Sequence, residues 1–205
     1  MNLKKAAVVF PGIGYHTDKP LLYYGKKLAA ARGYEIVDVP YGNFQHGIKG
    51  NAKKMRDAFE SALRQAEEIL ADRRLEEYDE LLFLSKSVGT VAASAYASNH
   101  HLTVRAGKHV RHIYFTPVDL TFLKAESRSG IVFHGTGDPW ASNEAVQEGC
   151  SRLSLPLFLI PDANHSLETG DVMRDLDNLK LVMEHCAAYL DRPFQGGSLP
   201  LKEEK

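Results

Sequence analysis

The sequence contains very little cysteine. Only Cys150 and Cys186 occur among its 205 residues, and their spacing fits neither a disulfide framework nor the paired spacing of zinc and redox motifs. We therefore interpret both side chains as small, buried, reduced thiols, which indicates a cytoplasmic protein.

An excess of charge of one sign and long apolar runs are also missing. Lysine and arginine number 25 against 26 acidic residues, so the net charge of −1 lacks the basic footprint of a nucleic-acid-binding protein. The apolar run at residues 6–10 spans five residues, which is too short for a signal peptide or a membrane span. These absences predict a protein that has neither nucleic acid nor a membrane as its partner.

What the chain does contain is the composition of an ordinary globular domain, with 44% hydrophobic and 25% charged residues. Short apolar segments typical of buried strands alternate with longer amphipathic segments typical of helices. We expect strands at 6–10, 34–39, 80–84, 112–116, 130–134 and 157–160. We expect helices at 20–32, 51–75, 88–99, 143–152 and 172–190, and a brief turn or helix at 119–125.

This alternation predicts an α/β fold, a three-layer sandwich in which a mostly parallel six-stranded sheet carries helices on both faces. No repeat, linker or change of composition divides the chain, so we expect one domain over residues 1–191 and a loose tail over 192–205. In such sheets ligands bind outside the carboxyl ends of the strands. The residues directly after each strand are therefore the candidates for function.

The third strand is followed by Ser85-Lys86-Ser87-Val88-Gly89, which leads straight into an alanine-rich segment. A sharp strand-to-helix turn needs small residues around its central residue. It exposes that residue's hydroxyl at a helix N-terminus, where developing negative charge is favoured. The alternative interpretation of Ser87 is a plain helix N-cap. Because such a pattern arises by chance in roughly one in five chains of this length, it needs support from elsewhere.

Support comes from the loops after other strands. Asp138 follows the fifth strand and His165 follows the sixth, so a hydroxyl, a carboxylate and an imidazole share one edge of the sheet. Serine needs a base to take its proton, and the imidazole needs a carboxylate to hold its tautomer. After the first strand, the glycines of Pro11-Gly12-Ile13-Gly14 let backbone N–H groups approach an oxyanion, together with the N–H of Val88.

At these residues the sequence resembles the α/β-hydrolase family, from the first strand to about residue 190. The resemblance implies a serine hydrolase that cleaves an ester or thioester through an acyl-enzyme, with no cofactor and no metal. Within the family, the sequence resembles small, lidless members such as carboxylesterases, thioesterases and dienelactone-hydrolase-like proteins. It implies Ser87 as nucleophile, Asp138 as orienting acid, His165 as base, and Ile13 and Val88 as donors of the oxyanion-hole N–H groups.

The sequence departs from the family pattern in several places. Ser85 stands where the family's turn usually opens with glycine, and Pro11-Gly12 stands where His-Gly is usual. The chain starts at what would be the third strand of the full fold, and only residues 117–129 occupy the place where larger members insert a lid. We therefore expect a minimal fold without a cap domain, whose shallow, open site accepts a small-molecule acyl substrate.

Several assignments have competitors. Asp119 and Asp162 are alternatives to Asp138 as the acid, and a non-catalytic domain that binds a small molecule or a protein is the alternative to an enzyme. A peptidase or carbon–carbon hydrolase could use the same three residues. Lys86 is either a solvated side chain or a partner for an anionic substrate group. The expected substrate-binding residues are Tyr15, Lys86 and Trp140, followed by His16 and Tyr41.

Other motifs are rejected as cofactor or metal sites. The segment 42–47 resembles a phosphate loop without its lysine and hydroxyl residue, and Gly12-Ile13-Gly14 lacks the third glycine of a dinucleotide fingerprint. A group of histidines has no acidic or cysteine partner in its segment. With the neighbouring basic residues we interpret it as a solvated basic loop, which comprises His100, His101, Arg105, Lys108, His109, Arg111 and His112.

Overall fold

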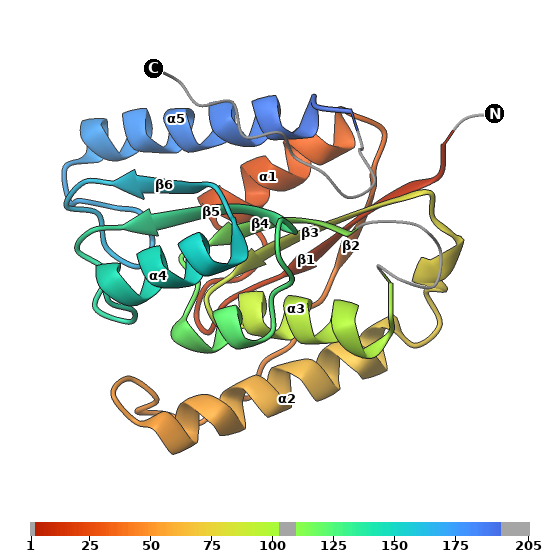
Figure 1. Cartoon of the computed structure of the whole chain (residues 1–205), viewed down its shortest axis with the longest axis horizontal. Helices are drawn as coiled ribbons and strands as arrows, with labels where there is room; N and C mark the ends of the chain where they lie inside the picture. Colours follow the sequence, from red (N-terminus) through yellow and green to blue (C-terminus); the bar gives the residue numbers. More distant parts are fainter. Residues whose placement is uncertain (1–2, 103–109, 194–205) are drawn as a thin grey trace.

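The structure, a computed structural model, describes residues 3–102 and 110–193 (Figure 1). Its centre is a six-stranded parallel sheet in the order β2-β1-β3-β4-β5-β6. The predicted α/β class is therefore confirmed, and every strand pair is parallel. The strands are β1 (Lys5–Phe10), β2 (Glu35–Asp38), β3 (Glu80–Lys86), β4 (Val110–Phe115), β5 (Gly130–Gly135) and β6 (Leu157–Ile160).

Helices cover both faces of the sheet, as expected for a three-layer sandwich. In Figure 1, α1 and α5 lie above the sheet, and α2, α3 and α4 lie below it. The helices are α1 (Pro20–Ala30), α2 (Ala52–Leu70), α3 (Val88–Asn99), α4 (Asn143–Leu153) and α5 (Val172–Leu190), with short 3-10 turns η1 (Leu75–Glu77) and η2 (Asp119–Leu123).

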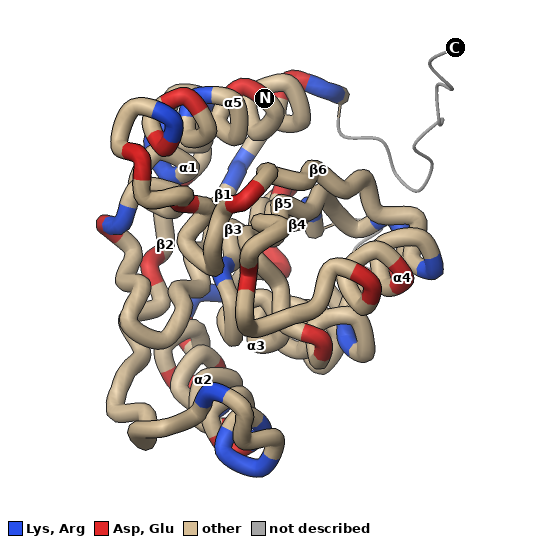
Figure 2. The backbone as a smooth tube through the Cα atoms, turned by 90° about the vertical axis from the view of Figure 1, so that its left-hand side faces the viewer, with Lys and Arg blue, Asp and Glu red and all other residues tan. Residues whose placement is uncertain are grey.

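The middle strands are apolar throughout because both of their faces are buried. In β3, Leu82 and Leu84 pack in the core under α1 and α5, whereas Leu81 and Phe83 pack in the core on the side of α2 and α3. A third, smaller core lies under α4. Figure 2 shows the same layers from the side, with acidic and basic residues interspersed along the helices.

The starts of the helices are encoded locally. Pro20 stands at the first turn of α1, where its missing N–H costs nothing. The side chains of Asn51, Ser142 and Asp171 accept hydrogen bonds from backbone N–H groups in the first turns of α2, α4 and α5. No helix of the described residues is both long and apolar enough to cross a membrane.

Two sequence predictions about the elements are wrong. The helix expected over 51–75 ends at Leu70, because residues 71–74 offer no large apolar side chain to bury, and Arg74 turns the chain with a φ of 46°. Arg111 and His112 belong to β4 and are buried, so they are not part of a solvated basic loop.

Arg111 can be buried because it has hydrogen-bond partners in the interior. It donates to the backbone carbonyls of Tyr189 and Leu190 at the C-terminal end of α5, and a cation is favoured at a helix C-terminus. His112 is buried as well, and its ring stacks on the ring of Tyr114. Residues 105, 108 and 109 of the predicted basic loop, and residues 194–205 of the predicted tail, lie outside the described residues.

Candidate active site

Ser87 occupies a strained turn between β3 and α3. Its φ of 56° and ψ of −127° are unusual for a residue other than glycine and cost on the order of 1–3 kcal/mol. Ser87 stands at the N-cap position of α3, but its side chain makes no capping hydrogen bond, so its hydroxyl does not act as a helix cap. The strained backbone turns the hydroxyl away from its own helix.

Gly89 explains why the motif ends in glycine. A Cβ atom at Gly89 would lie 2.3 Å from the carbonyl oxygen of Phe10 and 2.4 Å from that of Pro11. Only a residue without a side chain lets α3 begin this close to the end of β1. The motif therefore places the hydroxyl of Ser87 beside the loop that follows β1.

Two ring nitrogens of His165 connect a hydroxyl to a carboxylate. Nε2 lies 2.8 Å from Oγ of Ser87, and Nδ1 lies 2.7 Å from Oδ2 of Asp138. Because a carboxylate only accepts, Nδ1 carries the proton and Nε2 is free to accept from the serine hydroxyl. The other oxygen of Asp138, Oδ1, accepts from the backbone N–H of Trp140 at 2.9 Å.

Close contact between two loops brings the carboxylate and the imidazole together. A Cβ atom at Gly135 would lie 2.2 Å from the carbonyl oxygen of Ala163, and the N–H of Gly137 donates to the same oxygen at 2.9 Å. The loop after β5 therefore packs against the loop after β6. This packing holds Asp138, whose side chain is fully buried, against His165.

The other candidate carboxylates lie elsewhere. Asp162 is exposed and forms an ion pair with Arg174 at 2.9 Å. Asp119 is exposed at the first residue of η2. Both ring nitrogens of His165 already have partners, so the geometry favours Asp138 over its two competitors.

The environment of His165 favours its neutral form. Burial lowers the pKa of His165, the hydrogen bond that Nδ1 donates to Asp138 opposes this shift, and the positive charge of Lys86 lowers the pKa further. A neutral imidazole whose Nε2 faces a hydroxyl can act as a general base.

Two backbone N–H groups flank the serine. Gly12 and Tyr15 exchange backbone hydrogen bonds of 3.1 and 3.2 Å, which leaves the N–H of Ile13 at the corner of the turn. A Cβ atom at Gly12 would lie 3.1 Å from Cβ of Ser87, so this turn lies directly against the serine. Val88 is the first residue of α3, and the first N–H groups of a helix have no partner within it. The turn that carries Ile13 and the first turn of α3 therefore both lie beside Ser87.

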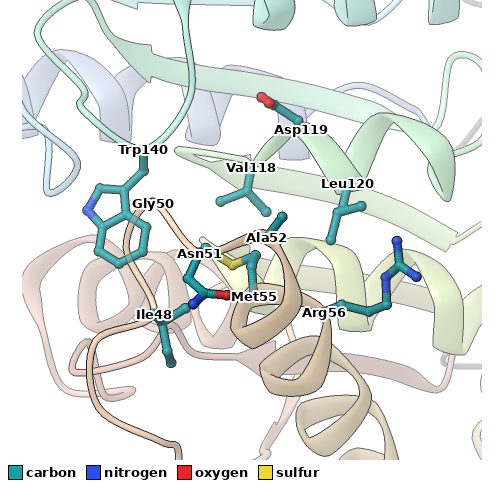
Figure 3. A pocket seen from close by; sticks show the side chains of 10 residues that line it. All are labelled: Ile48, Gly50, Asn51, Ala52, Met55, Arg56, Val118, Asp119, Leu120 and Trp140. Carbon is teal, nitrogen blue, oxygen red and sulfur yellow. The ribbon is translucent and has the colours of Figure 1, made fainter.

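Two cavities are lined by residues that neighbour this arrangement in space or in sequence. The larger, of about 380 Å³, extends from Trp140 to Arg56 on the first turns of α2, as Figure 3 shows. The indole of Trp140 also stacks on the ring of His165, with centroids 5.4 Å apart. The smaller cavity, of about 220 Å³, is lined by Tyr15 and by Leu167, two residues after His165. Trp140 and Tyr15 thus each connect a cavity to the triad region.

The remaining predicted substrate-binding residues differ in position. His16 is exposed. Tyr41 is buried and donates to the carbonyl oxygen of Pro11 at 2.5 Å, which supports the loop rather than a ligand. Lys86 is 1% exposed, so the interpretation as a solvated side chain is wrong. Its ammonium nitrogen lies 2.9 Å from Oγ1 of Thr116.

Comparison with known proteins identifies the architecture. No protein-family model matches the sequence, and no curated protein sequence matches it. Among solved structures, a serine hydrolase without a lid from Xanthomonas campestris matches with a TM-score of 0.60 and 16% identity over 98% of this chain and 86% of that chain. This is the α/β-hydrolase fold.

Two further solved structures share this fold at similarly low identity. Est1E from Butyrivibrio proteoclasticus has a TM-score of 0.63 and 11% identity, over 93% of this chain and 88% of its own. An esterase from Pyrococcus furiosus has a TM-score of 0.53 and 14% identity, over 91% of this chain and 84% of its own. As expected for a lidless α/β-hydrolase fold, only residues 116–129 with the short η2 connect β4 to β5.

Two residues of the site were missed by the sequence analysis. The buried His134 points Nδ1 at Asp138, 3.7 Å from Oδ2, while its Nε2 is hydrogen-bonded to Asn143. Thr116, at the end of β4, donates to the backbone carbonyl of His165 at 3.0 Å. The position of Thr116 directly after a strand was the available signal, because the α/β-hydrolase fold gathers its site at that edge. No cluster of metal-ligating side chains occurs in the described part of the chain.

Proposed function

We propose that this protein is a serine hydrolase that cleaves a carboxylic ester or thioester. The observation that carries the proposal is the continuous hydrogen-bonded chain from Ser87 through His165 to Asp138, with links of 2.8 and 2.7 Å. Isolated hydroxyls, imidazoles and carboxylates are common on protein surfaces. A buried carboxylate behind a histidine whose other nitrogen meets a strained serine is typical of activated nucleophiles.

In the proposed reaction, His165 takes the proton of Ser87 as Oγ attacks the substrate carbonyl carbon. The carbonyl oxygen becomes an oxyanion and accepts hydrogen bonds from the N–H groups of Ile13 and Val88. Collapse of this adduct breaks the bond to the leaving group, which departs as an alcohol or thiol with the proton from His165. Water, deprotonated by His165, then attacks the carbonyl carbon of the acyl-serine. The bond between that carbon and Oγ breaks, His165 returns the proton to Oγ of Ser87, and the carboxylic acid is released.

Asp138 supports both steps by orienting the imidazole and stabilising its protonated form. The buried position of the carboxylate strengthens this interaction, since the local dielectric constant is low. Trp140 contributes twice, because its backbone N–H fixes the carboxylate and its indole packs on the imidazole.

The cavities favour a substrate with apolar groups beside the carbonyl. The larger cavity has a mostly apolar wall, formed by Ile48, Met55, Val118, Leu120 and Trp140. Est1E, which has the same fold, has been solved with ferulic acid, an aromatic carboxylic acid, bound to it. We therefore propose that an aromatic or alkyl acyl group of the substrate packs against Trp140.

A panel of p-nitrophenyl esters, acyl thioesters and aminoacyl amides tests the proposal. We expect turnover of esters or thioesters by the wild type, no turnover by Ser87→Ala, and wild-type turnover by Ser98→Ala, which removes an exposed hydroxyl of α3. Preference for amides indicates a peptidase instead. Inactivity of the wild type on every compound contradicts the proposal and favours a binding domain.

A further inference from the structure

Lys86 is an ionisable side chain in the interior that the proposed reaction does not use. It lies between Ser85 and Ser87 at the end of β3, and its side chain is almost completely buried. Burying an ammonium group is costly unless its surroundings compensate. None of the ion pairs among residues 3–102 and 110–193 involves Lys86, so the compensation comes from other groups.

The first of these groups is the hydroxyl of Thr116. Nζ of Lys86 lies 2.9 Å from Oγ1 of Thr116, and that hydroxyl donates to the backbone carbonyl of His165 at 3.0 Å. A carbonyl can only accept, so the single proton of Thr116 is committed to it, and Lys86 is the donor to Thr116. The two hydrogen bonds therefore run in one direction, from the ammonium of Lys86 through the hydroxyl of Thr116 to the backbone carbonyl of His165.

The backbone of Thr116 indicates that this hydroxyl is held at a cost. Thr116 has a φ of 43°, a conformation that β-branched residues rarely adopt. Strain of this kind persists only where the surrounding structure enforces it, and it concentrates at functional sites. Here it directs Oγ1 toward both Lys86 and His165.

The second group is the turn that carries Ile13. The ring of Tyr15, which closes this turn, lies with its centroid 4.9 Å from Nζ of Lys86. A Cβ atom at Gly12 would lie 3.5 Å from Cδ of Lys86, so the turn rests on the aliphatic part of the lysine as well. Lys86 thus touches the turn that we propose to bind the oxyanion.

We propose that Lys86 is a positioning residue of the active site, which fixes the backbone of His165 through Thr116 and the Gly12–Tyr15 turn through Tyr15. This inference rests on the proposed serine hydrolase function. Ser87 and Lys86 are adjacent, so one turn of chain holds His165 at its ring and at its backbone. A displacement of about 1 Å in such a site costs up to a hundredfold in rate.

The charge of Lys86 adds a second effect on the same histidine. Burial lowers the pKa of Lys86 to about 7, while Asp138 and Glu168 oppose this shift. Lys86 is therefore charged on the acid side of neutrality, where its charge lowers the pKa of His165. His134 acts on His165 in the same direction, and Asp138 in the opposite one. Removal of the charge of Lys86 raises the pKa of His165 and weakens the site in acid.

The test compares Lys86→Met with Lys124→Met, which removes an exposed lysine after η2. For Lys86→Met we expect kcat to fall at least about tenfold, KM to change less than about twofold, and the acid limb of kcat/KM to move to higher pH. We expect the melting temperature to stay equal or to rise, because replacing a buried charge by an apolar side chain is often neutral or stabilising. Lys124→Met leaves all four quantities unchanged.

A second pair of variants decides the matter if Lys86→Met does not fold. Thr116→Ser keeps the hydroxyl that links Lys86 to His165, and Thr116→Val removes it with little change in shape. We expect Thr116→Ser to retain most of the activity and Thr116→Val to lose at least about tenfold in kcat. The inference is overturned if Thr116→Ser and Thr116→Val are equally active. It is also overturned if Lys86→Met keeps the wild-type kcat and the acid limb of its kcat/KM profile does not move. Absence of hydrolysis by the wild type contradicts the proposed function instead.

Discussion

Replacement of Asp138 by asparagine tests the roles within the hydrogen-bonded chain most sharply. The carboxylate accepts from Nδ1 of His165 through Oδ2 and from the N–H of Trp140 through Oδ1. An amide has only one oxygen. Since the N–H of Trp140 can only donate, the amide oxygen turns toward it, and the amide NH₂ faces the imidazole of His165.

That arrangement reverses the tautomer of His165. Nδ1 must accept from the amide, so the proton of the neutral ring moves to Nε2, which then cannot accept from Ser87. From the analogous defect in serine proteases we expect kcat to fall by roughly 10³- to 10⁴-fold, which corresponds to about 4–5.5 kcal/mol of activation free energy. KM should change little, because Asp138 is buried behind the histidine.

Steady-state hydrolysis of a p-nitrophenyl ester measures this loss, with circular dichroism to verify folding. Asp162→Asn serves as the control, because Asp162 is exposed and pairs with Arg174. We expect the control to behave as the wild type. Retention of more than a tenth of the activity in Asp138→Asn, or loss of activity in Asp119→Asn alone, refutes the assignment of the acid.

Three further outcomes are expected. The acid limb of kcat/KM should have its midpoint below pH 6.5, because burial lowers the pKa of His165 and the neutral base is lost only as the pH falls through that pKa. A midpoint above pH 6.5 in the pH profile contradicts this prediction. Gly89→Ala should lower the free energy of unfolding by about 1–3 kcal/mol, because the added Cβ atom would lie 2.3 and 2.4 Å from the backbone oxygens of Phe10 and Pro11. Denaturant titration measures this loss, and it should show none for Gly42→Ala, whose added Cβ atom meets open space. Trp140→Ala should reduce kcat/KM about tenfold more for esters of aromatic carboxylic acids than for acetate esters of the same alcohol, and equal reductions would remove Trp140 from the acyl pocket.

The fold was predictable because its signals are local and repeated. The apolar segment 157–160 and the amphipathic segment 172–190 coincide with β6 and α5. The segment 85–89 was recognisable because a sharp strand-to-helix turn requires small residues, although the contact of Gly89 with the end of β1 could not be read from the segment itself. Chain order after the strands then brought a hydroxyl, a carboxylate and an imidazole to one edge of the sheet.

Long-range partners explain what the sequence did not predict. A lysine is usually solvated, and the distant Thr116 and Tyr15 help to make the burial of Lys86 tolerable. In the sequence Arg111 is typical of a basic loop, but in the structure it is buried because carbonyl groups at the end of α5 accept its hydrogen bonds. His134 gave no signal of its own, because its place behind Asp138 depends on the packing of α4 and Asn143 against β5.

The most direct test of the central claim is covalent labelling by a fluorophosphonate, followed by intact mass and peptide mapping. If His165 activates Ser87, the wild type gains one phosphonyl group on Ser87, Ser87→Ala gains none, and His165→Gln reacts at least about a hundredfold more slowly. Equal labelling of wild type and Ser87→Ala, or no labelling of the wild type, contradicts the claim that Ser87 is an activated nucleophile.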